Sequence, residues 1–571
     1  MDRTAWIVVI LCVIGLGLWT WWTTKQQAQM RPAQQALSPS ATPIVAPSAS
    51  AIPSTPAPPV PTASVSPTAA PTPAIAEKTE TLRNDDVDLR LTNRGGGIAE
   101  ATLLNHIGQG NDRVVLNAKD QMPIGAMIEK PGEPQLDEFT LSKDPDGSVK
   151  CERVAENITI RKKFFFPPSK QKKDNFLAEM DVDLVNGGAQ PYSNPGYFIA
   201  LGSAAPVQPK EYPVPKLFWS VNGKAKNVDV GWFAASNGLF GMFQRPARPV
   251  FEEATLNAEW AAVSNQFFTT LIAPLTGKSD KVWARRFDVD ATKQMDGIAG
   301  AIRMPGFQLP PGQTYSAKFE IWAGPKLYHR LAQLDHNEAE IMDFGFFKIV
   351  CQLLLNSLNA LHHLLGNYAA AILALTVIVK MILWPIQNKA NRTGRQMALL
   401  GPKMQELKEK YKDDPTRMNQ ETMKLYKDYG INPVGGCLPM LIQFPVFIGL
   451  FTMLRQTVEL RGASFLWIHD LSQPDTVAHL PILNLPINVL PLLSALSSWW
   501  MIHVTPKTGD PTQQRVMYFM PVIFVALCYN FAAALALYYT VQNVLSIVQL
   551  YYNKRQPMPT LEKRLPPGKR K

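Results

Sequence analysis

YAAAILALTVIVKMILWPI, residues 368–386, is an apolar segment interrupted by a single charged residue, Lys380. About 20 apolar residues are enough for a helix to cross a bilayer. A cation near the middle of such a helix costs roughly 2.5–3.5 kcal/mol on the insertion scale, so it is usually retained for a function. The segment therefore predicts a membrane-spanning helix with a working lysine.

Five further apolar segments predict additional spans. The first, Thr4–Trp22, is interpreted as an uncleaved anchor (residues 1–25) rather than a signal peptide, because no small-residue cleavage site follows it closely. The others cover residues 437–456, 481–502, 517–531 and 532–552. The last two would make a helix about 54 Å long if they were continuous, so we expect a turn near Asn530. The sequence thus predicts six spans.

A large polar region separates the first two spans. Residues 26–76 are rich in Pro, Ala, Ser and Thr and predict an extended linker. Residues 77–324 contain short alternating runs between Gly, Pro, Asn and Asp clusters, which predict an all-β sandwich. The clearest runs are Asp86–Asn93, Asn157–Phe166, Phe176–Asn186 and Thr314–Gly324.

Residues 325–366 connect this region to the second span and contain an amphipathic helix, predicted over about 346–365. Its apolar residues recur at three- and four-residue steps, including Leu354, Leu358 and Leu361. We expect it to lie in the membrane interface. Periodicity alone also allows an ordinary helix packed on the β-sandwich.

Charge predicts the orientation of the chain. Of 571 residues, Lys and Arg number 57 against 46 Asp and Glu, and the excess is concentrated in residues 389–427 and in the tail, residues 553–571. Basic residues accumulate in cytoplasmic loops. Four spans separate the two clusters, so both fall on the same side. Both termini are therefore expected in the cytoplasm and the β domain outside it.

Polar side chains accompany Lys380 within the predicted spans. Tyr539, Gln542, Asn543, Ser546 and Gln549 share one face of the last span, while Thr376 and Gln443 lie in the second and third spans. Because polar groups in lipid need partners or water, this pattern favours a hydrated cavity open to the cytoplasm. The alternatives are that Lys380 extends to the interface and that the other groups only bond between helices.

The basic loop at residues 388–431 predicts a helical hairpin. Met397, Leu400, Met404 and Leu407 repeat before a break at Asp413–Pro415, and a second repeat follows it. Its methionines could offer an adaptable surface to other chains, or they could simply seal the hairpin.

Missing motifs narrow the functional classes. The sequence contains no GxxxxGK[ST] phosphate loop, HExxH or GxSxG motif, and its five cysteines show no metal-ligand spacing. We therefore expect neither an enzyme nor a cofactor.

Four motifs give the chain a resemblance to a known family. They are Asn432–Phe447 (NPVGGCLPMLIQFPVF), Trp467–Ser472 (WIHDLS), Phe519–Phe524 (FMPVIF) and the pair Tyr538–Tyr539. In these motifs the chain resembles the YidC-type membrane protein insertases over about residues 325–552. The anchor and β region resemble the Gram-negative branch, whose outer domain is a β-supersandwich.

The resemblance implies a polytopic α-helical protein of the inner membrane with a five-helix insertase core (residues 367–552) and a periplasmic β domain. It implies a hydrophilic, positively charged groove, with Lys380 at the family's basic position and Tyr538 among the lining residues. The implied function is insertion and chaperoning of membrane proteins. The implied partners are nascent membrane proteins, the Sec translocon, the ribosome and membrane lipid.

Two other functions are compatible with parts of the pattern. A secondary transporter could use Lys380 as an anion site, although the two halves of the chain show none of the internal repeats typical of transporters. A periplasmic sugar or peptidoglycan binder would not need five C-terminal spans. We therefore favour the insertase.

Overall fold

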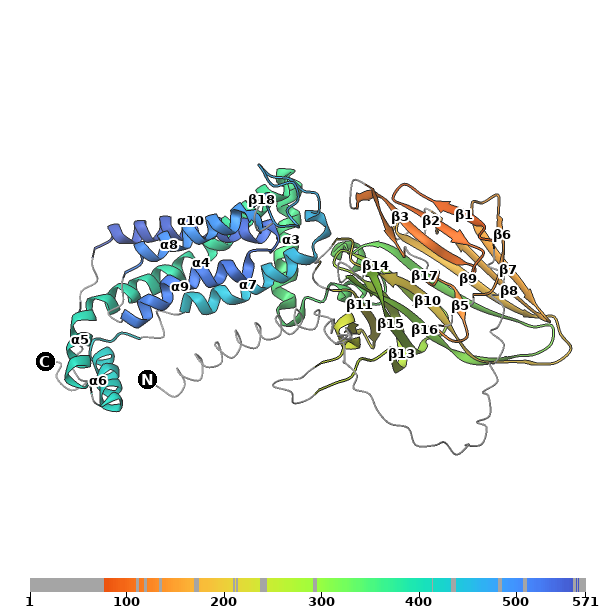
Figure 1. The fold of residues 1–571 in the computed structure, drawn as a ribbon, viewed down its shortest axis with the longest axis horizontal. Coiled ribbons are helices and arrows are strands. Elements are labelled where there is room, and N and C mark those ends of the chain that lie inside the picture. Colours follow the sequence, from red (N-terminus) through yellow and green to blue (C-terminus); the bar gives the residue numbers. More distant parts are fainter. Residues whose placement is uncertain are drawn as a thin grey trace, which may run out of the picture.

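The computed structural model describes residues 76–563, except for 109–111, 118–120, 133–135, 169–173, 209–210, 212–213, 237–243, 291–294, 413, 433–437, 481–484, 507–510, 558–560 and 562. The predicted anchor, the linker and the end of the tail lie outside these residues. The described chain forms a β domain followed by a bundle of helices. The β domain and the bundle lie end to end (Figure 1).

The β domain contains two antiparallel sheets. The smaller has the order β1 (Thr79–Arg83), β2 (Val87–Thr92), β3 (Gly97–Ile107) and β4 (Arg113–Leu116). The larger has the order β5 (Met127–Ile128), β10 (Tyr192–Ala204), β16 (Met295–Leu309), β15 (Ser279–Asp290), β13 (Val250–Ser264), β14 (Phe268–Pro274), β17 (Thr314–Pro325), β9 (Leu177–Asn186), β8 (Ile158–Phe165), β7 (Val149–Ala155) and β6 (Thr140–Lys143). Two more strands, β11 (Lys216–Val221) and β12 (Lys224–Asp229), branch from β13.

The alternation of apolar and polar residues along the strands explains why the two sheets pack face to face. In β9, Met180, Val182 and Leu184 are buried, while the aspartates between them are partly exposed, as expected for a strand with one core-facing side. Residues from both sheets, such as Leu91 of β2 and Phe164 of β8, belong to one hydrophobic core. The four runs predicted as strands form β2, β8, β9 and β17, and the sheets pack as a sandwich.

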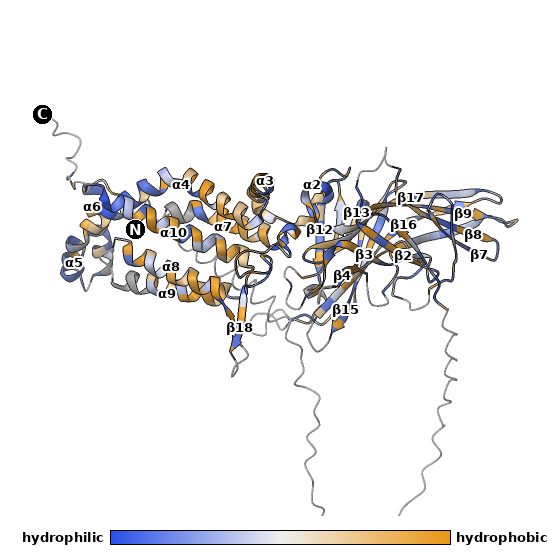
Figure 2. Cartoon of the chain, turned by 90° about the horizontal axis from the view of Figure 1, so that it is seen from above, coloured by the Kyte–Doolittle hydropathy of each residue, from blue (hydrophilic) through white to orange (hydrophobic). Residues whose placement is uncertain are grey.

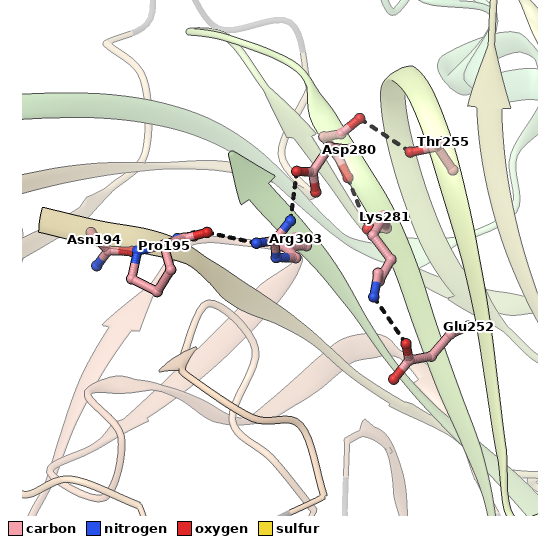
Figure 3. Close-up of polar contacts among 9 residues, drawn as sticks. Asn194, Pro195, Glu252, Thr255, Asp280, Lys281 and Arg303 are labelled. Atoms are coloured by element: carbon pink, nitrogen blue, oxygen red, sulfur yellow. Dashed lines mark hydrogen bonds and ion pairs between the residues drawn. The ribbon is translucent and has the colours of Figure 1, made fainter. Parts of the chain in front are cut away.

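Ion pairs join neighbouring strands at the edge of this core (Figure 3). The Arg303 guanidinium donates to Asp280 at 2.7 Å and to the Pro195 carbonyl at 2.6 Å. Lys281 donates to Glu252 at 3.0 Å. Gly196 lies within β10 with φ +119°, and a Cβ there would lie 2.9 Å from the Met304 carbonyl oxygen, so this position of the strand requires glycine.

The C-terminal half is helical. Its elements are α2 (Tyr328–Leu331), the 3₁₀ turns η3 (Glu338–Met342) and η4 (Gly345–Phe347), α3 (Lys348–Leu365), α4 (Tyr368–Leu399), α5 (Gly401–Lys410), α6 (Pro415–Asp428), α7 (Leu438–Gln456), the 3₁₀ turn η6 (Val458–Leu460), strands β18 (Thr476–Leu480) and β19 (Leu485–Asn488), α8 (Val489–Val504), α9 (Pro511–Cys528) and α10 (Ala533–Arg555). The bundle is mostly hydrophobic, whereas α5 and α6 at its far end are hydrophilic (Figure 2).

Among the described helices, α4 and α10 are long and apolar enough to cross a membrane, judged by length and composition. The segments Val489–Val504 and Val516–Cys528 are apolar but shorter. The turn expected near Asn530 is present, because α9 ends at Cys528 and α10 begins at Ala533. The count of six spans remains a prediction.

Two helices have bounds that differ from those of the predicted spans, whose limits in a membrane remain predictions. Helix α8 begins at Val489 rather than at Pro481, because residues 476–480 and 485–488 pair as an antiparallel hairpin. Asn488 anchors this hairpin by donating to the Tyr529 carbonyl at 2.7 Å and by accepting from the Thr476 hydroxyl. In addition, α4 does not end at Ile386 but continues to Leu399, well into the predicted cytoplasmic hairpin.

Helix α3 packs within the bundle. Leu354 and Leu358 are buried with residues of α4 and α7, and the Cys351 thiol donates to the Gly449 carbonyl at 3.4 Å. Ile349 and Leu353 on another side are exposed. The helix therefore packs on other helices of the bundle and still presents an apolar face, which is compatible with a position in the interface.

The β domain and the bundle meet at the end of α7. Val458 of η6 belongs to the core of the β domain. The Gln266 amide donates to the Arg455 carbonyl at 2.8 Å. The Arg461 guanidinium lies 5.4 Å from the ring centre of Phe268. These contacts connect the strand pair β13–β14 to the helices.

Candidate functional site

Lys380 lies in the middle of α4 and points into the bundle. Its residue is 2% exposed. The ammonium donates to the Gln387 side-chain oxygen at 2.5 Å and to the Ser546 hydroxyl at 2.8 Å. No acidic side chain among the described residues forms an ion pair with it. Lys380 is therefore a buried cation that has only neutral partners.

The last helix supplies one of these partners. The Ser546 hydroxyl accepts from Lys380 and donates to the Gln542 backbone carbonyl at 2.8 Å. Gln542 is 7% exposed, and its buried side-chain oxygen has no hydrogen-bond partner in the described chain. A buried oxygen without a hydrogen bond costs free energy. The Gln542 side-chain oxygen could therefore accept a hydrogen bond from a donor such as water.

The polar stripe predicted on α10 divides between two neighbouring helices. Asn543 faces α8, where its amide donates to the hydroxyls of Ser497 at 3.0 Å and Ser498 at 2.8 Å. Gln549 faces α4, where its amide donates to the Asn388 side chain at 2.8 Å. At these positions the polar groups do bond between helices, as the alternative interpretation expected.

Two tyrosines, Tyr538 and Tyr539, lie at the N-terminal end of the polar stripe on α10. The Tyr538 hydroxyl accepts from the Gln443 amide of α7 at 2.8 Å. The Tyr539 ring stacks on Phe524 of α9 with 4.3 Å between ring centres and also contacts Phe447 edge-on. Gln443 and Tyr538 thus form a pair, while Tyr539 lies among aromatic side chains.

Thr376 lies one turn before Lys380 and is fully buried. Its hydroxyl donates to the Ile372 carbonyl of its own helix at 2.7 Å. The hydroxyl oxygen of Thr376 can therefore still accept a hydrogen bond, but its proton is already used. The predicted residues consequently form separate groups: Lys380 with the Ser546–Gln542 turn, Asn543 with the serines, and Gln443 with Tyr538.

Sequence reasoning missed Gln387, Ser497 and Ser498. Gln387 lies two helical turns after Lys380 and one residue beyond the predicted end of the span, so a search limited to the span did not include it. The serines lie in an apolar helix at a spacing of three and four residues from Ser494. That spacing places the three serines on one side of α8, which is the signal that could have revealed them.

The hairpin formed by α5 and α6 has a small core of its own. Leu400, Tyr426 and Ile431 are buried, with Met404 and Met423 packed against them. The Tyr426 hydroxyl contacts the Met404 sulfur at 3.1 Å. These two methionines therefore help to seal the hairpin.

Two protein-family models match the chain. One, described as "60Kd inner membrane protein", matches residues 360–560, and the other, described as "YidC periplasmic domain", matches residues 80–356. The Membrane protein insertase YidC of Cupriavidus taiwanensis is 30% identical over 487 residues, which are 83% of this chain and 82% of that protein. The chain belongs to the YidC family of membrane protein insertases. As the two descriptions state, the family comprises inner membrane proteins with a periplasmic domain.

Other YidC relatives match different parts of the chain. The insertase of Syntrophobacter fumaroxidans is 39% identical over 52% of this chain and 53% of its own length. That of Nitratidesulfovibrio vulgaris (strain DP4) is 28% identical over 97% of this chain and 99% of its own length. The membership in the YidC family therefore covers both the β domain, which is the periplasmic domain of the family, and the helical membrane region.

Proposed function

We propose that this chain inserts membrane proteins into the bacterial inner membrane and helps them to fold, alone or with the Sec translocon. In this proposal, a hydrophilic groove around Lys380 receives part of the incoming polypeptide. The basic hairpin and tail face the cytoplasm and the ribosome, and the β domain lies in the periplasm. Membership in the insertase family supports the activity.

The observation that carries the proposed site is the neutral environment of Lys380. A structural lysine in a bilayer normally pairs with an acid or reaches the interface. Here the ammonium is buried, and within the described part of the chain its hydrogen bonds go to Gln387 and Ser546 alone. Its charge is therefore available to attract a carboxylate on an incoming segment.

The test compares Lys380 variants in cells depleted of the wild-type chain. We expect Lys380→Arg to support insertion, because it preserves the charge. Lys380→Leu should reduce insertion of clients with acidic outer tails at least several-fold. Insertion is measured by protease accessibility of a pulse-labelled client.

Lys389→Leu provides the control, because it removes an exposed lysine from the same helix. Full activity of Lys380→Leu would contradict the proposed role of the charge. Photocrosslinking from position 380 during translation of a client tests contact directly. If the depleted cells inserted every client normally, the proposed activity itself would be wrong.

A further inference from the structure

A cavity of about 110 Å³ lies in the β domain, far in sequence from Lys380. It is lined by parts of β2, β3 and β15 and by the segment Gln121–Pro123. Three arginines from separate places in the sequence line it: Arg90, Arg94 and Arg285. Arginine offers a planar fork of donors that suits carboxylate and phosphate groups.

Arg285 is the most unusual of the three. It lies on β15 between Trp283 and Phe287, which share its side of the strand and pack in a small apolar cluster with Met122. Its Nε atom is buried and has no hydrogen-bond partner among the residues that the structure describes. No acidic side chain in the described chain pairs with it. A partly buried cation without a counter-charge is unfavourable.

The other charged groups do not neutralise this arginine. Arg90 is already paired with Glu100 at 2.9 Å, although its buried Nε also has no partner. The Arg94 side chain forms no ion pair with any residue that the structure describes. Only Glu77, which is exposed, adds a further negative charge to the lining. Two arginines therefore face one unpaired carboxylate, which leaves an excess positive charge.

We propose that this cavity binds a small oxyanion, a carboxylate or a phosphate, with Arg285 and Arg94 as its main donors. The anion supplies the counter-charge that Arg285 lacks and accepts from its guanidinium. The site is independent of the insertion groove, because it belongs to the β domain and uses none of the residues around Lys380.

The proposal is tested by equilibrium dialysis of the full-length chain, in a neutral detergent and Tris chloride, against radiolabelled orthophosphate. We expect saturable binding of one phosphate per chain. Arg285→Gln should weaken this binding at least tenfold, and Arg94→Gln should weaken it as well. Arg161→Gln is the matched control, because Arg161 is an exposed arginine on β8 outside the cavity.

Acetate added as a competitor distinguishes the two ligand classes. Displacement of phosphate by acetate indicates a site that accepts carboxylates, whereas no displacement indicates a phosphate site. The unfolding temperature provides a second readout: phosphate should raise it in the wild type and in Arg161→Gln but not in Arg285→Gln. Absence of saturable binding of both anions, or equal binding by wild type and both cavity variants, would overturn the proposal.

Discussion

Lys162 is a fully buried lysine that holds the two sheets of the β domain together. From β8, its ammonium donates to the carbonyls of Gly95 at 2.6 Å and Gly125 at 3.2 Å. It also lies 4.5 Å from the ring centre of Phe139. Burial lowers the pKa of Lys162 to about 8, and yet its hydrogen bonds satisfy two carbonyls that no strand partner reaches.

We expect Lys162→Met to destabilise the β domain by about 2 kcal/mol. The substitution keeps the apolar stem, but it leaves two buried carbonyls without a donor, each costing roughly 1–3 kcal/mol, while removing the cost of a buried charge. The measurement is chemical unfolding of the full-length chain followed by tryptophan fluorescence. Lys163→Met, on the exposed side of the same strand, should change stability little, and equal effects of the two variants would contradict this role.

His106 should make the stability of the β domain depend on pH. Burial lowers the pKa of His106 to about 4, with the nearby Arg461 acting in the same direction. Between pH 6.5 and 4 the unfolded chain binds a proton that the folded chain does not, so stability falls as pH falls. The difference in unfolding free energy between wild type and His106→Phe should change by up to about 3 kcal/mol across this window. A difference that stays constant from pH 7 to pH 4 would contradict the assignment.

At the scale of elements, amide side chains connect α4 to α10. Asn388 accepts from Gln549 at 2.8 Å and from Asn553 at 3.0 Å. We expect Asn388→Leu to lower the stability of the bundle by about 1–2 kcal/mol, because the Asn553 amide loses its acceptor and the Gln549 amide is left with the Trp384 carbonyl at 3.2 Å. Thermal unfolding in detergent measures the effect. Asn391→Leu, three residues later on the same helix, is the control, and an equal loss there would argue against a specific role of Asn388.

The same elements show what the sequence could and could not predict. Strand alternation predicted β2, β8, β9 and β17, and apolar length predicted the apolar helices of the bundle, because both patterns follow from which side of an element is buried. The start of α8 was missed because residues 481–488 are apolar enough for a span, whereas the structure pairs 485–488 with β18. The polar stripe on α10 was predicted to face one cavity. In the structure α10 lies between α4 and α8, so Asn543 bonds to α8 and Ser546 bonds to α4. Periodicity identifies a polar face and cannot identify its partners.

At the scale of the whole molecule, two polar side chains help to join the β domain to the end of α7. Arg461 lies against Phe268, and Gln266 reaches the end of α7. We expect Arg461→Leu to loosen this junction, because it removes a cation–π contact worth about 0.5–2 kcal/mol. Faster hydrogen exchange of the backbone at residues 266–268 and 458–460 would show this effect.

Arg248→Leu is the control for the junction. Arg248 lies 4.6 Å from the ring centre of Trp232, so it makes a similar contact within the β domain. Its loss should leave exchange at the junction unchanged. Unaltered exchange in Arg461→Leu would show that this cation–π contact is not needed to hold the two parts together.

The long helix α4 contains one residue that cannot donate a backbone hydrogen bond, Pro385. The contact between Lys380 and Gln387 passes across this proline, from five residues before it to two residues after it. The lysine side chain therefore bridges the point where α4, the helix that joins the bundle to the hairpin of α5 and α6, lacks a backbone hydrogen bond. A group that draws the ammonium away from Gln387 would also leave α4 freer to bend at Pro385, so an event at Lys380 would change the position of the hairpin formed by α5 and α6.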